Sequence, residues 1–430
     1  MDELDRNRLE EFRQLRKEVR HSEEHLIVGI DIAKDRHHAF FGTATGKTLL
    51  RRLVFSNDHE GFRKLLDQAE ALRVGHGLKK VVYGMEPTAN YHKPLGEYLI
   101  GLGRMVVLVS GVTVKRNRES IDGRWDKHDV KDSANVADLI SQGKCLYYEY
   151  PSAKLRGLRG LLSLKRRLKK QEHGYRVRIR NHLIAQYFPE MDRDYERLGA
   201  EGLSIVRWCL PASQIVQLDI DPFIERVTSR RIRMEKRRRL EAIWERAGES
   251  IGCEGVPGVE HEAKVMVEGL RQIREMIKET EDKIEELCRE FSEYPYVLTI
   301  PGFGPDVSAK VLGAIGDPYR FQNGKQVLKM GGLDLSADRS GKDSDKAIPE
   351  ISKRGKADLR YALYQAALVA SVKNRQVMIY YTNKIRGRER EKGIHIKMRV
   401  KLAAKLLVIA WTLMKKKEVF NPAYLNAEQS

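Results

Sequence analysis

The chain has 430 residues and a formal net charge of +19, from 79 Lys and Arg residues against 60 Asp and Glu residues. This length exceeds one ordinary hydrophobic core, so we expect two or three domains, and the positive charge points to a polyanionic partner, nucleic acid first. The longest apolar run, Leu406 to Met414, is too short to span a bilayer, so we expect a soluble, cytoplasmic protein with no membrane partner. The four cysteines lie far apart without a Cys-x-x-Cys pair, which argues against a zinc knuckle and a disulfide framework.

Residues 1–24 are rich in charge, and we expect them to form a helical arm outside the first domain. Leu26 to Ile32 is a nearly unbroken apolar run, typical of a buried strand, and Asp31 interrupts it. A buried carboxylate is costly unless a cation or hydrogen bonds pair with it, or unless it lies at the strand's end. The next predicted elements are two strands that continue the sheet as a meander and a helix capped by Asn57 or Asp58, over residues 37–43, 49–55 and 58–72.

Lys80 to Glu86 repeats this pattern, because it is apolar up to an acid at its end and Pro87 then stops it. A helix over 91–100 and a strand over 105–109 return the chain to the sheet as strand-helix-strand units. Asp31 and Glu86 therefore end two strands that are candidates for neighbours in one sheet. Each acid taken by itself is also explained as a capping or surface residue, Glu86 more readily than Asp31.

Lys127 to Asp132 places Asp129 and Asp132 three residues apart at the start of a predicted helix, where both acids share one face. A solvated helix start would explain these two alone, because Asp is favoured there. Together with Asp31 and Glu86 they make four carboxylates that one fold can bring together. Such hard oxygen ligands suit Mg²⁺ or Mn²⁺, and two of these ions can activate the attacking oxygen and stabilise the leaving one in phosphodiester chemistry.

Three segments resemble, in order and spacing, the motifs of the RuvC-like DEDD domain in transposases of the insertion sequence 110 family, relatives of the Piv DNA invertases. They are Gly29 to Lys34, Glu86 to Thr88, and Lys127 to Asp132. His128 is a departure, because a threonine is usual there. The resemblance implies a ribonuclease-H-type α/β domain over 25–150, in which the metal-binding and catalytic residues are Asp31, Glu86, Asp129 and Asp132. Lys127 is expected to contact nucleic acid beside them.

The region 151–292 is predicted to be helical and strongly basic. Leucines recur at helical spacing from Leu155 onward, beside a basic stripe that includes Arg166 and Arg167. A second basic run includes Arg237 and Arg238. Basic runs of this kind suit contacts with a phosphate backbone, although many are merely solvated faces.

Apolar residues from Met266 to Phe291 alternate spacings of four and three, which is the pattern of a heptad seam. This seam is long enough to pair with another helix of this chain or of a second copy. In the family, the corresponding region is a coiled coil used for dimerisation. The resemblance therefore implies a homo-oligomer, a dimer or a tetramer, formed through the coiled coil.

The last region, 293–430, is expected to be mainly helical and opens with a glycine-bearing turn, Thr299 to Pro305, that leads into an apolar helix. In such a turn, which resembles a helix-hairpin-helix turn, Gly302 and Gly304 would let backbone N–H groups approach a phosphate. Similar turns also occur without any ligand.

A polar, glycine-bearing segment over 336–355 has the profile of a functional loop, but composition singles out none of its serines as a nucleophile. It resembles the C-terminal transposase domain of the same family through four short motifs, which are Gly332-Leu333, Ser340-Gly341, Ile351 to Gly355, and Leu359-Arg360. In that domain the serine of the Ser-Gly pair attacks DNA, which implies that Ser340 is the nucleophile, with Ser336 and Ser344 as the other candidates. A serine hydroxyl needs a base or a metal to draw off its proton, and the four acids would supply it if the first domain of the same or a neighbouring chain docks there. Phosphate contacts, or simple surface charge, are assigned to Lys342, Lys353, Arg354 and Arg360.

The resemblance implies a DNA recombinase that moves its own insertion sequence through a phosphoserine link, guided by a structured bridge RNA that pairs with donor and target DNA. Two other classes remain open from the residues. One is a Holliday-junction-type nuclease that uses only the four acids, a metal and water. The other is a non-enzymatic nucleic-acid-binding scaffold, in which the acids are structural.

Overall fold

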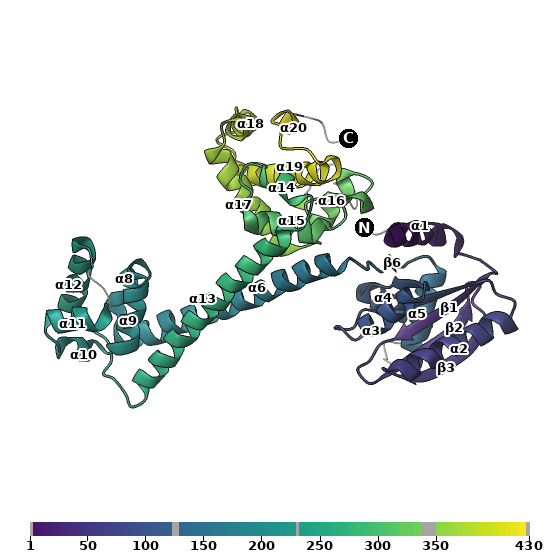
Figure 1. Ribbon diagram of the computed structural model, residues 1–430, viewed down its shortest axis with the longest axis horizontal. Coiled ribbons are helices and arrows are strands. Elements are labelled where there is room, and N and C mark those ends of the chain that lie inside the picture. The colour runs from purple at the N-terminus through teal and green to yellow at the C-terminus, as the bar shows by residue number, and fades with distance from the viewer. Residues whose placement is uncertain (1–2, 123–128, 229–231, 337–349, 427–430) are drawn as a thin grey trace. The chain divides into compact units, whose positions relative to one another are not determined.

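The computed structural model describes residues 3–122, 129–228, 232–336 and 350–426 (Figure 1). The chain divides into two compact units, Met1–Ser152 and Ala153–Ser430. Within the described ranges, no helix combines the length and the apolar character that crossing a membrane requires.

A mixed sheet of six strands forms the centre of the first unit. Its order is β3-β2-β1-β4-β5-β6, in which β4 is parallel to β1 and to β5 and the other neighbours are antiparallel. The strands are β1 (His25–Asp31), β2 (Arg36–Thr43), β3 (Thr48–Ser56), β4 (Lys80–Met85), β5 (Met105–Leu108) and β6 (Leu146–Tyr147). The predicted meander is confirmed, and each of the five predicted strands ends within one residue of its expected bounds. β6 was not predicted, because a strand of two residues is too short to show an alternating pattern in the sequence.

Five helices cover the two faces of the sheet. They are α1 (Glu3–Glu18), α2 (His59–Gly75), α3 (His92–Gly101), α4 (Gly111–Asp122) and α5 (Asp129–Ser141). Because successive side chains of a strand point to opposite faces, Leu26, Val28 and Ile30 pack with α2 and α3, whereas Ile27 packs with α1, α4 and α5. The cap of α2 is Asp58, whose carboxylate accepts a hydrogen bond from Gly61 N at 2.8 Å.

The segment expected to be a separate arm instead packs on the sheet as α1. Its residues Phe12, Leu15 and Val19 are at most 6% exposed and join the core beside Ile27. Arg8 donates to Tyr148 O and lies over the Tyr147 ring. The charged residues of α1 thus obscured an apolar spacing of three and four residues that buries one face of the helix.

The second unit begins with a pair of long helices that lie side by side, α6 (Ala153–Arg178) and α13 (Val259–Arg289) (Figure 1). Residues of the predicted heptad seam, among them Ile273, Ile277 and Ile284, are buried, and Leu168 of α6 packs against the first two. The seam therefore has a partner helix within the chain.

A helical subdomain with its own core connects α6 to α13. Its elements are η1 (Ile179–Ile184), α7 (Ala185–Tyr187), η2 (Pro189–Met191), α8 (Asp192–Leu198), α9 (Ala200–Trp208), α10 (Ala212–Val216), α11 (Ile220–Val227) and α12 (Met234–Gly248).

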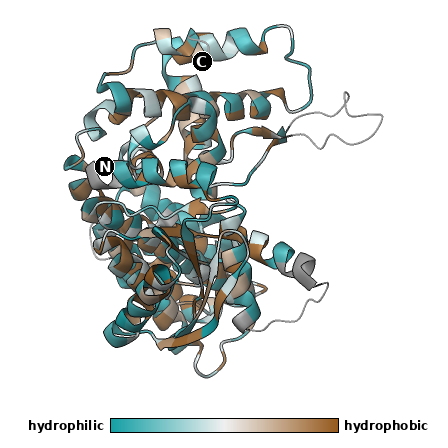
Figure 2. Ribbon diagram, turned by 90° about the vertical axis from the view of Figure 1, so that its right-hand side faces the viewer, coloured by the Kyte–Doolittle hydropathy of each residue, from teal (hydrophilic) through white to brown (hydrophobic). Residues whose placement is uncertain are grey.

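The C-terminal part of this unit packs around α17 and α19 and also buries Leu158 of α6 and Ile284 of α13. Its elements are α14 (Tyr294–Leu298), α15 (Pro305–Ile315), η3 (Pro318–Arg320), α16 (Gly324–Gly331), β7 (Leu335–Ser336), β8 (Glu350–Ile351), α17 (Ala357–Lys373), α18 (Arg375–Ile385), α19 (Ile394–Lys416) and α20 (Ala423–Asn426). Figure 2 shows that hydrophobic residues, in brown, and hydrophilic residues, in teal, alternate along the helices. The expectation of an α/β domain followed by helical regions is confirmed.

Candidate active site

Two acids lie at the same edge of the sheet, at the ends of neighbouring strands. Asp31 is the last residue of β1, and Glu86 directly follows β4. The two strands are parallel, and the register pairs Ile30 with Met85, so that the next residue of each strand is the acid. Both acids are partly exposed. This edge, where the carboxyl ends of parallel strands meet, is where α/β proteins usually place their functional groups.

Helix α5 crosses the sheet unusually closely, because two glycines that are register partners make room for it. A Cβ built on Gly29 would lie 2.2 Å from Ser133 O and 2.6 Å from Ala137 N, and one on Gly84 would lie 2.0 Å from Ile140 Cδ1. This crossing holds the first turn of α5, which begins at Asp129 and contains Asp132, near the end of β1. The Asp132 side chain is only 4% exposed, whereas the side chain of Asp129 and all of Lys127 lie outside the described residues.

We expect Gly29→Ala to lower the free energy of unfolding by about 1–3 kcal/mol, because the new methyl group would push against the backbone of α5. Urea unfolding of the full chain, followed by the transition of the first unit, measures this loss. Gly84→Ala is the matched control, since its methyl group would meet side-chain atoms of Ile140 and Val107 rather than the backbone of α5. Equal costs for the two variants would contradict the close backbone contact.

Glu86 lies against the start of α4. A Cβ built on Gly111 would lie 2.5 Å from its Oε1 atom. Val109 N, at the end of β5, donates to Met85 O at 3.0 Å, which holds this segment beside the end of β4. A side chain at position 111 would therefore displace the Glu86 carboxylate.

The turn after Asp31 is fixed by His37, which sequence reasoning missed, and by Asn57, which it considered only as a helix cap. His37 is fully buried on β2, and its Nδ1 accepts a hydrogen bond from Ala33 N at 3.2 Å. Burial lowers the pKa of His37, which keeps the ring neutral and able to accept. Asn57 donates from Nδ2 to Lys34 O at 3.0 Å and from its backbone to Asp35 O at 2.9 Å. The sequence signal that could have revealed this role is a histidine, His37, at an inward-facing position of a predicted strand.

The acids suit a hard divalent cation by type and by their place at one sheet edge. Among the side chains that the structure describes, however, no three acids, histidines or cysteines are grouped closely enough to hold a metal ion. Asp31 and Glu86 therefore share one sheet edge, but the described side chains do not form a closed ligand set. The Asp129 side chain would have to contribute to such a set.

In the second unit, two chain segments that flank residues 337–349 in the sequence cross each other tightly. Cβ atoms built on Gly332 and Gly355 would lie 2.9 Å from Gly355 N and 2.5 Å from Gly332 N. Ser352 N donates to Asp334 O at 2.8 Å, and the Ser352 hydroxyl donates to the Asp334 carboxylate. The short ladder of β7 and β8 follows directly. Ser340, Ser344 and Lys342 lie outside the described residues, as does the side chain of Ser336.

The basic residues predicted around this loop differ in their availability. Arg360 donates to Gly331 O at 3.2 Å and so supports the glycine crossing. Lys353, in the left-handed region at φ 54°, and Arg354 are exposed. Of the predicted basic residues that the structure describes here, Lys353 and Arg354 therefore present their charge to solvent.

The basic residues of the middle region are partly neutralised by acids of the same chain. Arg237 pairs with Asp221 at 2.6 Å and Glu241 at 2.9 Å. Arg166 approaches Asp358 at 3.4 Å. Arg167 and Arg238 are exposed, and within the described ranges neither makes an ion pair. A phosphate would have to compete for Arg237, so the run is less cationic than its sequence indicates.

The glycine turn before α15 is packed against protein. Gly302 has φ 82°, and a Cβ built on it would lie 2.2 Å from Ala366 O of α17, whereas one on Gly304 would meet nothing within 4 Å. In the first turn of α15, Asp306 binds Lys165 of α6 at 2.5 Å and Lys310 at 2.7 Å. The carboxylate places negative charge at the helix N-terminus, where a phosphate was predicted to bind.

Lys165 also binds Glu281 of α13 at 2.9 Å and is 13% exposed, so one ammonium group joins three helices. Burial alone would lower the pKa of Lys165, but Asp306 and Glu281 raise it. Burial likewise would raise the pKa of Asp306, but hydrogen bonds from Lys165 and Lys310 lower it. The stability from Asp306 is therefore present above its unfolded pKa and is lost as pH falls through the lower folded value. The stability from Lys165 is present below its unfolded pKa and is lost as pH rises through the higher folded value.

We expect Lys165→Met to cost about 1–3 kcal/mol of unfolding free energy at neutral pH, the size of a lost hydrogen bond between charged groups. The cost should shrink below about pH 4, where Asp306 becomes protonated in the unfolded chain. Thermal unfolding at several pH values measures both effects. Lys169→Met, which removes a more exposed pair with Glu172, is the control. A cost that stays constant from neutral pH into acid would contradict the role of the ion pair.

Comparisons with known proteins match most of the chain. Residues 28–189 match a family described as "Transposase", the DEDD domain of IS110 elements, and residues 294–382 match a family described as "Transposase IS116/IS110/IS902 family". A 44.8 kDa uncharacterized protein of insertion element IS116 from Streptomyces clavuligerus is 24% identical over 93% of this chain and 96% of its own length. A 42 kDa uncharacterized protein of insertion element IS900 from Mycobacterium paratuberculosis is 23% identical over 93% of this chain and 98% of its own length.

Proposed function

The chain belongs to the IS110 family of transposases, and from this premise we propose that it cuts and rejoins DNA strands through a phosphoserine intermediate, with a divalent metal at an acidic site. The observation that carries the proposal is the close crossing of α5 over Gly29 and Gly84. This crossing supports the proposal that the start of α5 lies near the sheet edge that ends in Asp31 and Glu86.

The residues that would hold the metal are Asp31, Glu86, Asp129 and Asp132, in a domain that we propose to be RuvC-like. Mg²⁺ or Mn²⁺ suits oxygen ligands of this kind. When bound, the cation would neutralise charge on the phosphate and acidify a nearby hydroxyl group. His37 and Asn57 would keep the backbone beyond Asp31 in place, so that the carboxylate meets its ligand without reorganisation.

Ser340 is the proposed nucleophile. Its Oγ forms a bond to the phosphorus of a DNA phosphodiester and loses its proton to a base, while the bond to the leaving oxygen breaks and that oxygen takes up a proton. A free DNA hydroxyl then attacks the phosphoserine and regenerates the serine, so the exchange needs no oxidant, reductant or nucleotide. Lys342, Lys353 and Arg354 would neutralise the strand phosphates.

We also propose a structured guide RNA and a homo-oligomer. The net charge of +19 supports an extended polyanionic partner. The seam of α13 is covered by α6 of its own chain, so an oligomer through these helices would use their outer faces. Ser340 would then meet the acids of the same or of a neighbouring chain.

The test is to trap a covalent adduct between the protein and labelled DNA that carries the element's ends, in Mg²⁺, after denaturation. We expect the adduct from wild-type protein and from Ser344→Ala, and none from Ser340→Ala. Strand cleavage that persists in Ser340→Ala without an adduct would favour the nuclease that uses the acids and water. Absence of cleavage in every form, with DNA still bound, would favour a scaffold.

A further inference from the structure

The end of α19 carries three consecutive lysines, two of which lie beside aromatic rings. Lys415 Nζ lies 4.7 Å from the centre of the Trp411 ring and 5.6 Å from that of Tyr319. Lys416 Nζ lies 5.6 Å from the centre of the Tyr424 ring. Tyr319 also donates from its hydroxyl to Lys415 O at 3.0 Å, which ties its ring to the helix end. The ammonium groups are thus held in place without the use of carboxylates.

These lysines keep their charge available. Within the part of the chain that the structure describes, none of Lys415, Lys416 and Lys417 makes an ion pair, and the last two are exposed. Lysines at a helix C-terminus are favoured by the helix dipole alone. The helix dipole does not explain why aromatic rings lie beside these lysines. Tyr319 in particular is 50% exposed, although it is a large aromatic residue.

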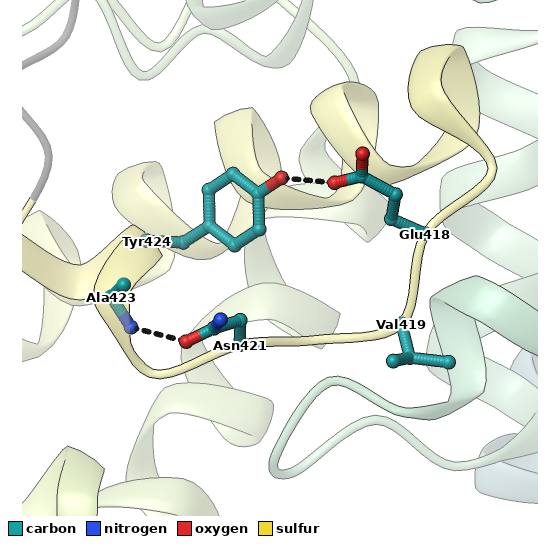
Figure 3. Close-up of a pocket in the computed structure, with 5 residues that line it drawn as sticks. All are labelled: Glu418, Val419, Asn421, Ala423 and Tyr424. Carbon is teal, nitrogen blue, oxygen red and sulfur yellow. Dashed lines mark hydrogen bonds between the residues drawn. The ribbon is translucent and has the colours of Figure 1, made fainter.

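A pocket of about 580 Å³ lies directly beyond the lysines (Figure 3). It is lined by Glu418, Val419, Asn421, Ala423 and Tyr424. Tyr424 donates to Glu418 Oε2 at 2.6 Å, a hydrogen bond that raises the pKa of the phenol and keeps it protonated. Asn421 accepts from Ala423 N at 2.9 Å through Oδ1, which leaves its amide N–H groups as donors toward the pocket side of the loop.

The charges divide this surface into two parts. The lysines attract phosphate, whereas the Glu418 carboxylate repels it from the pocket. A carboxylate, an amide and an aromatic ring are instead the groups that recognise an unpaired nucleobase, through hydrogen bonds to its edge and stacking on its face. A paired base in a duplex offers neither its face nor its whole edge.

We propose that the end of α19 and the adjoining pocket bind a single-stranded nucleic-acid segment, with phosphates on Lys415 to Lys417 and a base on Tyr424. The end of α19 and the residues that line the pocket lie outside the residues that match the two family descriptions, whereas Tyr319 lies within the second match. The proposal rests on the proposed function only in that the protein handles nucleic acid, and it does not involve Ser340 or the four acids.

The experiment measures the affinity of the full-length protein for fluorescent 12-nucleotide single strands, as DNA and as RNA of the same sequence, and for a 12-base-pair DNA duplex. In the double variant Lys415→Gln, Lys416→Gln we expect about tenfold weaker binding of the single strand and a flatter salt dependence, by roughly 0.7 per lost phosphate contact. The matched control is Lys325→Gln, Lys329→Gln on α16, which removes the same charge from exposed positions of the same domain. It should change the affinity by less than about twofold.

A second pair of variants tests the base contact. Tyr424→Ser should weaken single-strand binding by about fivefold or more, whereas Tyr424→Phe, which keeps the ring, should retain it. Neither should change binding of the duplex. The tighter of the DNA and RNA strands identifies the natural source of the segment, and thermal unfolding checks that each variant is folded.

The inference is overturned if the α19 lysine variant and the α16 control lose the same affinity, or if Tyr424→Ser weakens duplex and single strand alike. Binding without cleavage would leave the inference intact while the proposed function fails. Cleavage of DNA with unchanged single-strand affinity in all variants would leave the proposed function intact while the inference fails.

Discussion

Asp31→Asn is expected to lower the rate of metal-dependent DNA cleavage by about 10²–10³-fold, the range seen when one preorganised electrostatic contact to a reacting group is removed. The substitution keeps the shape of the side chain and removes its charge at the end of β1. Asp31 is the strand-end acid whose backbone is held most firmly, by β4 on one side and by the turn that His37 and Asn57 fix. Single-turnover cleavage in Mg²⁺ measures the effect.

The fold should survive this substitution. Carboxylates held near one another repel, so loss of one charge leaves stability without metal unchanged or slightly higher. The second readout is the binding of Mn²⁺, which we expect to be weaker in Asp31→Asn. It is measured through the spectrum of the ion and does not depend on catalysis. Asp35→Asn is the matched control, because Asp35 is exposed four residues further along in the same turn. Marked unfolding of Asp31→Asn, or cleavage as fast as in Asp35→Asn, would show that the acid is structural.

The strand ends were predictable because a few neighbouring residues determine each of them. An apolar run that stops at an acid specifies both the strand and the place of the acid, and the β1–β4 pairing put Asp31 and Glu86 side by side as expected. The position of α5 was not predictable in the same way. It depends on Gly29 and Gly84 being register partners, and register emerges only once the strands pair.

The basic stretches could not be interpreted from the sequence, because their ion-pair partners come together only in the fold. Counting charges treats Arg237 and Arg238 alike, but the fold places Asp221 and Glu241 beside one and not the other. The partner acid Asp221 is sixteen residues away in sequence, so no local pattern announces it. Likewise α1 reads as a charged arm until the sheet supplies an apolar face for Phe12, Leu15 and Val19.

The glycine turn before α15 offers the sharpest separation of a structural from a ligand-binding role. Gly302→Ala is expected to lower the unfolding free energy of the second unit by about 2–5 kcal/mol, which combines overpacking with the strain of a left-handed alanine. The overpacking arises because the new methyl group would lie 2.2 Å from the backbone oxygen of Ala366, in the middle of α17. Urea unfolding of the full chain gives the loss, and the second-unit transition should move to lower urea.

Gly304→Ala is the matched control, two residues away in the same turn. It has φ −111°, which alanine adopts readily, and its added methyl group would meet nothing within 4 Å. We therefore expect a change of less than about 0.5 kcal/mol, as for a surface substitution away from special contacts. If the turn bound a phosphate, the open position at Gly304 would be where the backbone approaches it, and Gly304→Ala would weaken DNA binding while leaving stability unchanged. The alternative outcome is a stable Gly304→Ala with unchanged DNA affinity, together with a destabilised Gly302→Ala. That result would show that the turn serves to pack against α17 and does not bind a phosphate.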